Sequence, residues 1–169
     1  YCDRERVDTK VRLGLFIKIC QAIQHAHQKG VIHRDLKPGN VLVTLHDGKP
    51  VPKVIDFGLA KFANEVRAVG LTMDGALLGT LEYMSPEQAS LSNLDSDVRS
   101  DVYSLGVMLY ELVSGTLPID RQTAKELSLE ELRRRICDTE PPRPSKRLST
   151  LRDERDTIAE RRGIDVKQL

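Results

Sequence analysis

Polar residues that suit phosphate and metal chemistry stand in two short loops of the chain. Asp35, Lys37 and Asn40 fall within six consecutive positions, directly after a short apolar run. Asp56 follows a second apolar pair, Val54-Ile55, and lies sixteen residues beyond Asn40. Carboxylate and amide oxygens at loop positions after strands can hold divalent cations against phosphate oxygens. This spacing therefore indicates phosphoryl transfer assisted by a bound cation.

The residues around these groups complete a longer motif. Residues 31–40 read V-I-H-R-D-L-K-P-G-N, and residues 56–58 read D-F-G. An H-R-D-L-x-x-x-N segment followed by D-F-G is the catalytic signature of protein kinases. The chain thus resembles the eukaryotic-type (Hanks-type) serine/threonine protein kinases, with a layout similar to that of bacterial members.

The resemblance implies a role for each polar residue of the two loops. Asp35 would be the base that accepts the proton of the substrate hydroxyl, and Lys37 would neutralise the phosphate transferred from ATP. Asn40 and Asp56 would bind Mg²⁺ beside the phosphates. Two carboxylates near one phosphate site require cations to neutralise them. ATP and Mg²⁺ are therefore the expected cofactors.

Two residues indicate the class of substrate. Small-molecule phosphotransferases that share the kinase fold usually carry histidine where this chain has Lys37. Thr80, after Gly79, matches the threonine that contacts the catalytic aspartate in serine/threonine kinases. Tyrosine kinases differ at both places. The expected reaction is transfer of the γ-phosphoryl group of ATP to serine or threonine hydroxyls of protein substrates.

The resemblance also implies structural roles around the motif. His33 would pack beneath the loop against Phe57, and Asp101 at the start of a central helix would anchor it. Gly58 completes the D-F-G motif. His25 and His27 are two apart on a predicted helix and point to different faces, so a histidine-based metal site is not expected.

Regulation is expected in the segment after the second loop. Arg34 would pair with a phosphate on that segment, because a guanidinium binds phosphate bidentately. Thr72 is the candidate phosphorylation site, and a solvent-exposed threonine without that role is the alternative. Glu87 stands in Ser-Pro-Glu where the family usually has Ala-Pro-Glu, and it would pair with a late arginine.

The composition is that of an ordinary soluble domain. The 169 residues carry a net charge of +1, with 40% hydrophobic and 30% charged residues. This balance argues against a dominant polyanion-binding role, so no nucleic-acid partner is expected. The three cysteines show no C-x-x-C spacing, which favours reduced thiols in the cytoplasm. No apolar run approaches the roughly 20 residues of a membrane span, although a parent protein could be anchored elsewhere.

Apolar spacing predicts the elements that position the two loops. A helix is expected from Val11 to His27, capped by Asp8 or Thr9 and stopped by Gly30. Its expected buried stripe is Leu13, Phe16, Ile17, Cys20 and Ile23. Short strands are expected at 31–32, 41–45 and 53–55, with Asp47-Gly48 as a turn and Pro50 and Pro52 in an edge or unpaired position.

Later elements are predicted in the same way. The pattern predicts a cap at Ser85 with Pro86 in the first helical turn, after a long loop over 59–81. The helix from Asp101 to Ser114 is apolar nearly all round and is expected to be central. A capping box, Ser128 with Glu131, opens a helix that runs to Cys137. Further expected features are a solvated charge run at 133–135, a break at 140–145 and a polar helix over 151–162.

The expected fold class is α+β with a protein-kinase-like fold: a mainly helical large lobe with short strands at the catalytic loop. The chain holds no G-x-G and no V-A-I-K-like stretch, so the small N-terminal lobe is expected to be absent and the isolated chain to bind Mg·ATP weakly. Residues 1–144 are expected to form the C-terminal kinase lobe, and 145–169 a charged tail or an incomplete end of that lobe. The alternatives are a non-catalytic regulatory or scaffold remnant and a small-molecule phosphotransferase.

Overall fold

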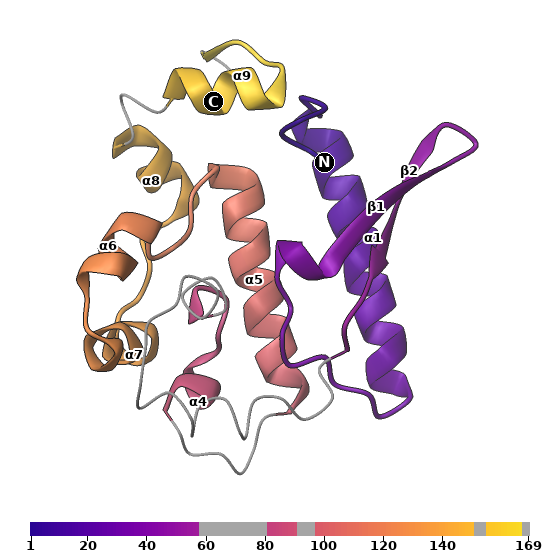
Figure 1. Ribbon diagram of the computed structural model, residues 1–169. Helices are drawn as coiled ribbons and strands as arrows, with labels where there is room; N and C mark the ends of the chain where they lie inside the picture. Colours follow the sequence, from indigo (N-terminus) through magenta and orange to yellow (C-terminus); the bar gives the residue numbers. More distant parts are fainter. Residues whose placement is uncertain (58–80, 91–96, 151–154, 167–169) are drawn as a thin grey trace.

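A long helix forms the centre of the molecule. The computed structural model describes residues 1–57, 81–90, 97–150 and 155–166, and this part is mainly helical with one two-stranded antiparallel sheet. Helix α5 (Val98–Ser114) runs between α1 with its hairpin on one side and a group of short helices on the other (Figure 1). These short helices are α6 (Arg121–Glu126), α7 (Leu129–Asp138) and α8 (Pro144–Thr150).

Helix α1 (Thr9–Gln28) begins where the sequence predicts but buries a different face. The Asp8 side chain caps it by accepting a hydrogen bond from the Val11 amide at 2.9 Å. Its buried apolar residues are Leu15, Ile19 and Ile23. The expected stripe was wrong at Leu13 and Ile17, and the latter side chain is 56% exposed. Because α1 is apolar on more than one face, its contacts with α5 and β2 select the buried one.

The sheet is a hairpin built on a two-residue turn. Strands β1 (Val41–His46) and β2 (Lys49–Val54) pair in register from Val41 opposite Val54 to His46 opposite Lys49. Asp47 and Gly48 have φ of 49° and 72°, which matches the Asp-Gly turn expected between strands of right-handed twist. In the figure the hairpin extends away from α5 (Figure 1).

Two strand boundaries differ from the prediction. β2 begins at Lys49 and includes Pro50 and Pro52, which lie opposite Leu45 and Val43. In a two-stranded sheet both strands are edges, so neither proline interrupts a central ladder. Residues 31–32 form no strand. The Val31 amide instead donates to the Ala26 carbonyl at 3.0 Å, which closes the end of α1.

Helix α5 carries polar residues in its buried surface. Asp97 caps its start and Gly115, at φ of 77°, ends it in the left-handed region, as expected for a glycine terminator. The helix starts three residues before the predicted Asp101. Its surface is less uniformly buried than predicted, since Val102 is 60% exposed. Four of its buried residues are polar, namely Ser100, Asp101, Ser104 and Ser114.

The remaining elements cover the two ends of α5. Helix α4 (Pro86–Ala89) follows the Ser85 cap as predicted, and α7 opens with the predicted capping box of Ser128 and Glu131. α4, α6 and α7 share an apolar cluster whose buried members are Leu81, Met84, Ala89, Ala124, Leu132 and Ile136. Helices α6 and α8 were not predicted. Helix α9 (Arg155–Arg162) covers the described part of the predicted C-terminal helix.

No helix in the described ranges is long and apolar enough to cross a lipid bilayer.

Candidate active site

The loop after α1 brings three of the predicted site residues into direct contact. The Asn40 side-chain amide donates to the Asp35 carbonyl at 2.7 Å and to Asp35 Oδ2 at 3.0 Å. Lys37 Nζ lies 3.1 Å from the same Oδ2. Asn40 is buried at the end of the 3₁₀ turn η1 (Pro38–Asn40), whose tight backbone sets the spacing between the amide and the carboxylate. The loop thus presents a carboxylate held on one side by an amide and a cation.

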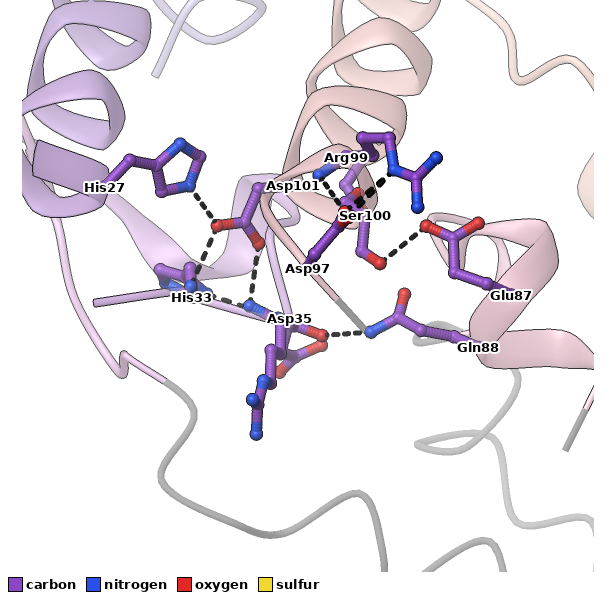
Figure 2. Close-up of polar contacts among 11 residues, drawn as sticks. His27, His33, Asp35, Glu87, Gln88, Asp97, Arg99, Ser100 and Asp101 are labelled. Carbon is purple, nitrogen blue, oxygen red and sulfur yellow. Dashed lines mark hydrogen bonds and ion pairs between the residues drawn. The ribbon is translucent and has the colours of Figure 1, made fainter. Parts of the chain in front are cut away.

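A buried carboxylate on α5 holds the backbone just before Asp35. Asp101, only 1% exposed, accepts the His33 amide at Oδ2 and the Arg34 amide at Oδ1, both at 2.8 Å. His27 Nε2 lies 2.7 Å from Asp101 Oδ2 and reaches it from α1 (Figure 2). Asp101 of α5 therefore joins three parts of the chain through these polar contacts: α1, α5 and the loop of residues 31–40 that carries the kinase motif, here called the catalytic loop.

The predicted packing of His33 is present. Its ring is fully buried and lies 4.8 Å from the Phe57 ring, centroid to centroid. His33 Nε2 contacts the Ile55 carbonyl at 2.9 Å, and the Ile55 amide donates to the Asn40 carbonyl at 3.0 Å. These contacts fasten residues 55–57 against the catalytic loop. His33 therefore links the two motif loops through its packing.

Asp56 lies between two of these fastened residues. Its side chain is exposed, and its φ of 54° places the backbone in the left-handed region. A non-glycine residue in that region costs of order 1–3 kcal/mol and persists only where its neighbours hold it. Ile55 and Phe57 supply those contacts here. The strained backbone turns the exposed carboxylate out of the packed segment.

The donor set of the two loops suits a hard cation. The Asn40 amide nitrogen already serves Asp35, which leaves the amide oxygen as the atom for a cation, and Asp56 offers an exposed carboxylate. Mg²⁺ is usually held by one or two protein oxygens together with substrate phosphates. Within the described ranges no three His, Cys, Asp or Glu side chains gather as a metal site. An oxygen pair completed by a nucleotide fits both observations.

Helix α4 closes the site from the side opposite α1. Glu87 Oε1 accepts a hydrogen bond from Ser100 Oγ at 2.6 Å. Burial alone would raise the pKa of Glu87, but the hydrogen bonds from Ser100 and the backbone hold that pKa below its ordinary value. No arginine of the described ranges pairs with Glu87 at ion-pair distance. Among the described residues, a side-chain hydrogen bond to Glu87 therefore comes from Ser100 of α5.

Not every predicted residue can be placed. Gly58, Thr72 and Thr80 lie outside the described residues, so their roles stay predictions. The Arg34 side chain is exposed on the catalytic loop, and its backbone φ is 67°.

Sequence reasoning missed three residues that the structure brings to the site: His27, Gln88 and Ser100. Gln88 Nε2 donates to the Arg34 carbonyl at 2.8 Å (Figure 2). The S-x-x-Q spacing of Ser85 and Gln88 was an available signal, because it is a capping-box pattern. For His27 and Ser100 no local signal exists, since their partners lie 74 and 13 residues away.

Comparisons with known proteins identify the family of the chain. The family model described as "Protein kinase domain" matches residues 4–161. The chain is similar to serine/threonine-protein kinase pkn3 of Myxococcus xanthus, with 43% identity over 77% of the chain and 23% of the relative. It is similar to Pkn1 of the same organism, with 42% identity over 79% of the chain and 18% of the relative. It is also similar to the probable serine/threonine-protein kinase PknB of Corynebacterium glutamicum, with 37% identity over 76% of the chain and 19% of the relative. The chain thus spans about a fifth of the length of these relatives.

Proposed function

The chain belongs to the protein kinase family, and on that basis we propose that the protein carrying it is a serine/threonine protein kinase. It transfers the γ-phosphoryl group of ATP to serine or threonine hydroxyls of protein substrates. The observation that carries the proposal is the Asp35 carboxylate, held through Oδ2 by Asn40 and Lys37. The relatives are named serine/threonine-protein kinases, which favours protein substrates over small alcohols.

In this proposal Asp35 acts as the general base. Its Oδ2 is engaged by the Asn40 amide and by Lys37, which leaves Oδ1 to accept the proton of the substrate hydroxyl. A positioned base of this kind contributes about 10²–10⁴-fold to the rate. The two contacts on Oδ2 restrict rotation of the carboxylate, so Oδ1 keeps a fixed orientation toward the substrate hydroxyl.

Lys37 and the oxygen pair handle charge on the phosphate. Lys37 Nζ lies 3.1 Å from Asp35 Oδ2, and in this proposal its charge would neutralise the phosphoryl group that is transferred beside the base. Asn40 and Asp56 would hold Mg²⁺, which when bound neutralises charge on the phosphate oxygens. The Ile55 amide bonds to the Asn40 carbonyl and Phe57 packs against His33, so the backbone on both sides of Asp56 is held beside the catalytic loop.

The C-terminal residues are part of the same lobe in this proposal. Helix α8 packs on α5, and Arg147 forms an ion pair with Asp120 at 3.0 Å. In α9, Ile158 is buried and lies against Gly115 at the end of α5. These contacts support placing α8 and α9 in the same lobe as α5, and they argue against a separate charged tail.

The test is the substitution Asp35→Asn in the full-length protein that carries this chain. Removal of the base should lower phosphate transfer from labelled ATP to a generic protein substrate by about 10²–10⁴-fold. Asp47→Asn is the matched control, since Asp47 lies in the exposed hairpin turn and asparagine tolerates its positive φ. Protein phosphorylation that survives Asp35→Asn would contradict the proposal. Transfer to small alcohols and not to protein would favour a small-molecule phosphotransferase.

A further inference from the structure

One glutamine connects helix α4 with the peptide that leads into Asp35. Gln88 Nε2 donates to the Arg34 carbonyl at 2.8 Å. Its Oε1 accepts from both the Ser85 amide and the Ser85 hydroxyl at 3.1 Å. Both ends of the side-chain amide are therefore engaged, one within the cap of α4 and one across to the catalytic loop.

Further hydrogen bonds connect α4, α5 and the backbone of Arg34 with one another. Asp101 on α5 holds the backbone amide of Arg34, and its neighbour Ser100 holds Glu87 on α4. Gln88, next to Glu87, returns to the carbonyl of Arg34. Asp101 and Ser100 of α5 and Glu87 and Gln88 of α4 thus belong to one connected set of hydrogen bonds. Figure 2 shows the side chains of these four residues. Arg34 is held through its N–H from α5 and through its C=O from α4.

These two hydrogen bonds hold Arg34, a residue with a strained backbone. Arg34 has φ of 67°, a left-handed backbone conformation that L-residues adopt only at an energetic cost. The carbonyl of Arg34 and the amide of Asp35 belong to one peptide unit. Gln88 holds the oxygen of that unit, and His33 Nδ1 lies 3.3 Å from its nitrogen. The plane of the peptide, and so the direction in which the Asp35 side chain leaves the backbone, is set from both sides.

We propose that Gln88 is a positioning residue for the phosphoryl transfer: it fixes the Arg34–Asp35 peptide and thereby the orientation of the base. The inference rests on the proposed function, because it assigns to Gln88 a part in the work of Asp35. The chemistry requires an amide at this position. Glutamate could still accept from Ser85 but could not donate to the carbonyl, and methionine could do neither.

The test uses Gln88→Glu in the full-length protein. The side chain keeps its size and its acceptor toward Ser85 but loses the donor toward Arg34. Because a displaced base weakens catalysis more than nucleotide binding, kcat for protein phosphorylation should fall about 10- to 100-fold while KM for ATP stays unchanged. Hydrogen–deuterium exchange of the Arg34 and Asp35 amides should become faster in the same variant. Gln21→Glu, on an exposed turn of α1, makes the same chemical change as a control and should alter neither quantity.

The two measurements separate this inference from the proposed function. Unchanged exchange at Arg34 and Asp35 in Gln88→Glu would overturn the inference, whether or not the protein is a kinase. Faster exchange together with a wild-type kcat would also overturn it, since the Gln88–Arg34 hydrogen bond would then have a structural role only. If the wild-type protein phosphorylates no protein, the proposed function fails and Gln88 loses its assigned role. The exchange data would still show whether Gln88 holds the Arg34–Asp35 peptide.

Discussion

At the scale of single residues, Asp101 explains how the catalytic loop keeps a strained backbone. Its two oxygens accept the amides of His33 and Arg34, and Oδ2 also meets His27. Hydrogen bonds to an ionised acceptor are roughly twice as strong as neutral ones. The buried Asp101 side chain is thus hydrogen-bonded at both oxygens, and its contacts with the two backbone amides hold the positive φ of Arg34 in place.

We expect Asp101→Asn to destabilise the protein strongly. Asparagine offers one acceptor oxygen, and its NH₂ group would face a donor, so at least one buried amide would lose its partner. The loss should be about 2–4 kcal/mol in the free energy of unfolding, measured by urea denaturation. Asp97→Asn is the control, because Asp97 caps the same helix from an exposed position and asparagine caps equally well. Equal effects of the two substitutions would contradict the role given to Asp101.

The residues of the catalytic loop could be predicted because the loop is local. Asp35 and its contact residue Asn40 lie five positions apart, so their meeting depends on a single turn of backbone. The contact of Gln88 with Arg34 spans 54 residues and depends on how α4 docks. A spacing pattern contains no information on that docking. Sequence alone therefore predicted which residues of the loop lie together, but not the hydrogen bond from Gln88 that holds the Arg34–Asp35 peptide.

At the scale of elements, the contact between α4 and α5 is polar as well as apolar. Ser100 Oγ donates to Glu87 at 2.6 Å, and Ser104 Oγ donates to the Tyr83 carbonyl at 2.7 Å. Both serines lie on one face of α5, four residues apart. The sequence predicted a helix that is apolar nearly all round, but this face of α5 carries hydrogen bonds that hold α4 and the segment before it.

The Glu87–Ser100 bond makes part of the stability depend on pH. Because the pKa of Glu87 is lowered in the folded protein, its contribution is present above the unfolded glutamate pKa of about 4.3 and is lost as pH falls through the lowered value. Ser100→Ala removes one of the hydrogen bonds that lower the pKa of Glu87, so this pKa should rise from its lowered value. We expect an upward shift in the NMR titration of Glu87 and a shallower fall of stability between about pH 5 and pH 3.

Ser149→Ala is the control for that measurement, since its hydroxyl donates only to the nearby Lys146 carbonyl in α8. It should leave the titration of Glu87 unchanged. An unaltered Glu87 titration in Ser100→Ala would contradict the account of its pKa.

Element boundaries were predictable where local chemistry decides them. Asp8 and Ser128 each cap a helix by bonding to the adjacent backbone, and each lies where the sequence predicted it. The face of α1 was not predictable. Leu13 and Leu15 are both compatible with a helical apolar stripe, and only the positions of α5 and β2 decide which of them is buried.

At the scale of the whole molecule, the N-terminal segment meets the last described helix, α9. Arg12, buried in α1, donates to the Cys2, Val7 and Arg161 carbonyls and pairs with Asp3. Figure 1 shows α9 lying over the start of α1. At Gly163, with φ of 62°, an added Cβ would lie 2.9 Å from the Arg6 carbonyl oxygen, so only glycine allows this approach. The N-terminal segment and α9 are thus joined through backbone carbonyls gathered on one guanidinium.

Arg12→Lys tests whether that guanidinium joins the ends. Lysine keeps the charge but has a single nitrogen, which cannot satisfy three carbonyls that arginine reaches through separate N–H groups. The carbonyls left without a donor should cost about 2–4 kcal/mol of unfolding free energy. Because Arg161 would lose its link to α1, hydrogen exchange should accelerate in α9 more than in α5. Arg4→Lys is the control: Arg4 is exposed and, among the described residues, its one ion pair is with the neighbouring Glu5, so stability and exchange should not change. Uniform acceleration across α5 and α9 would instead mean that Arg12 supports the fold as a whole and does not act as a local tie between the two ends.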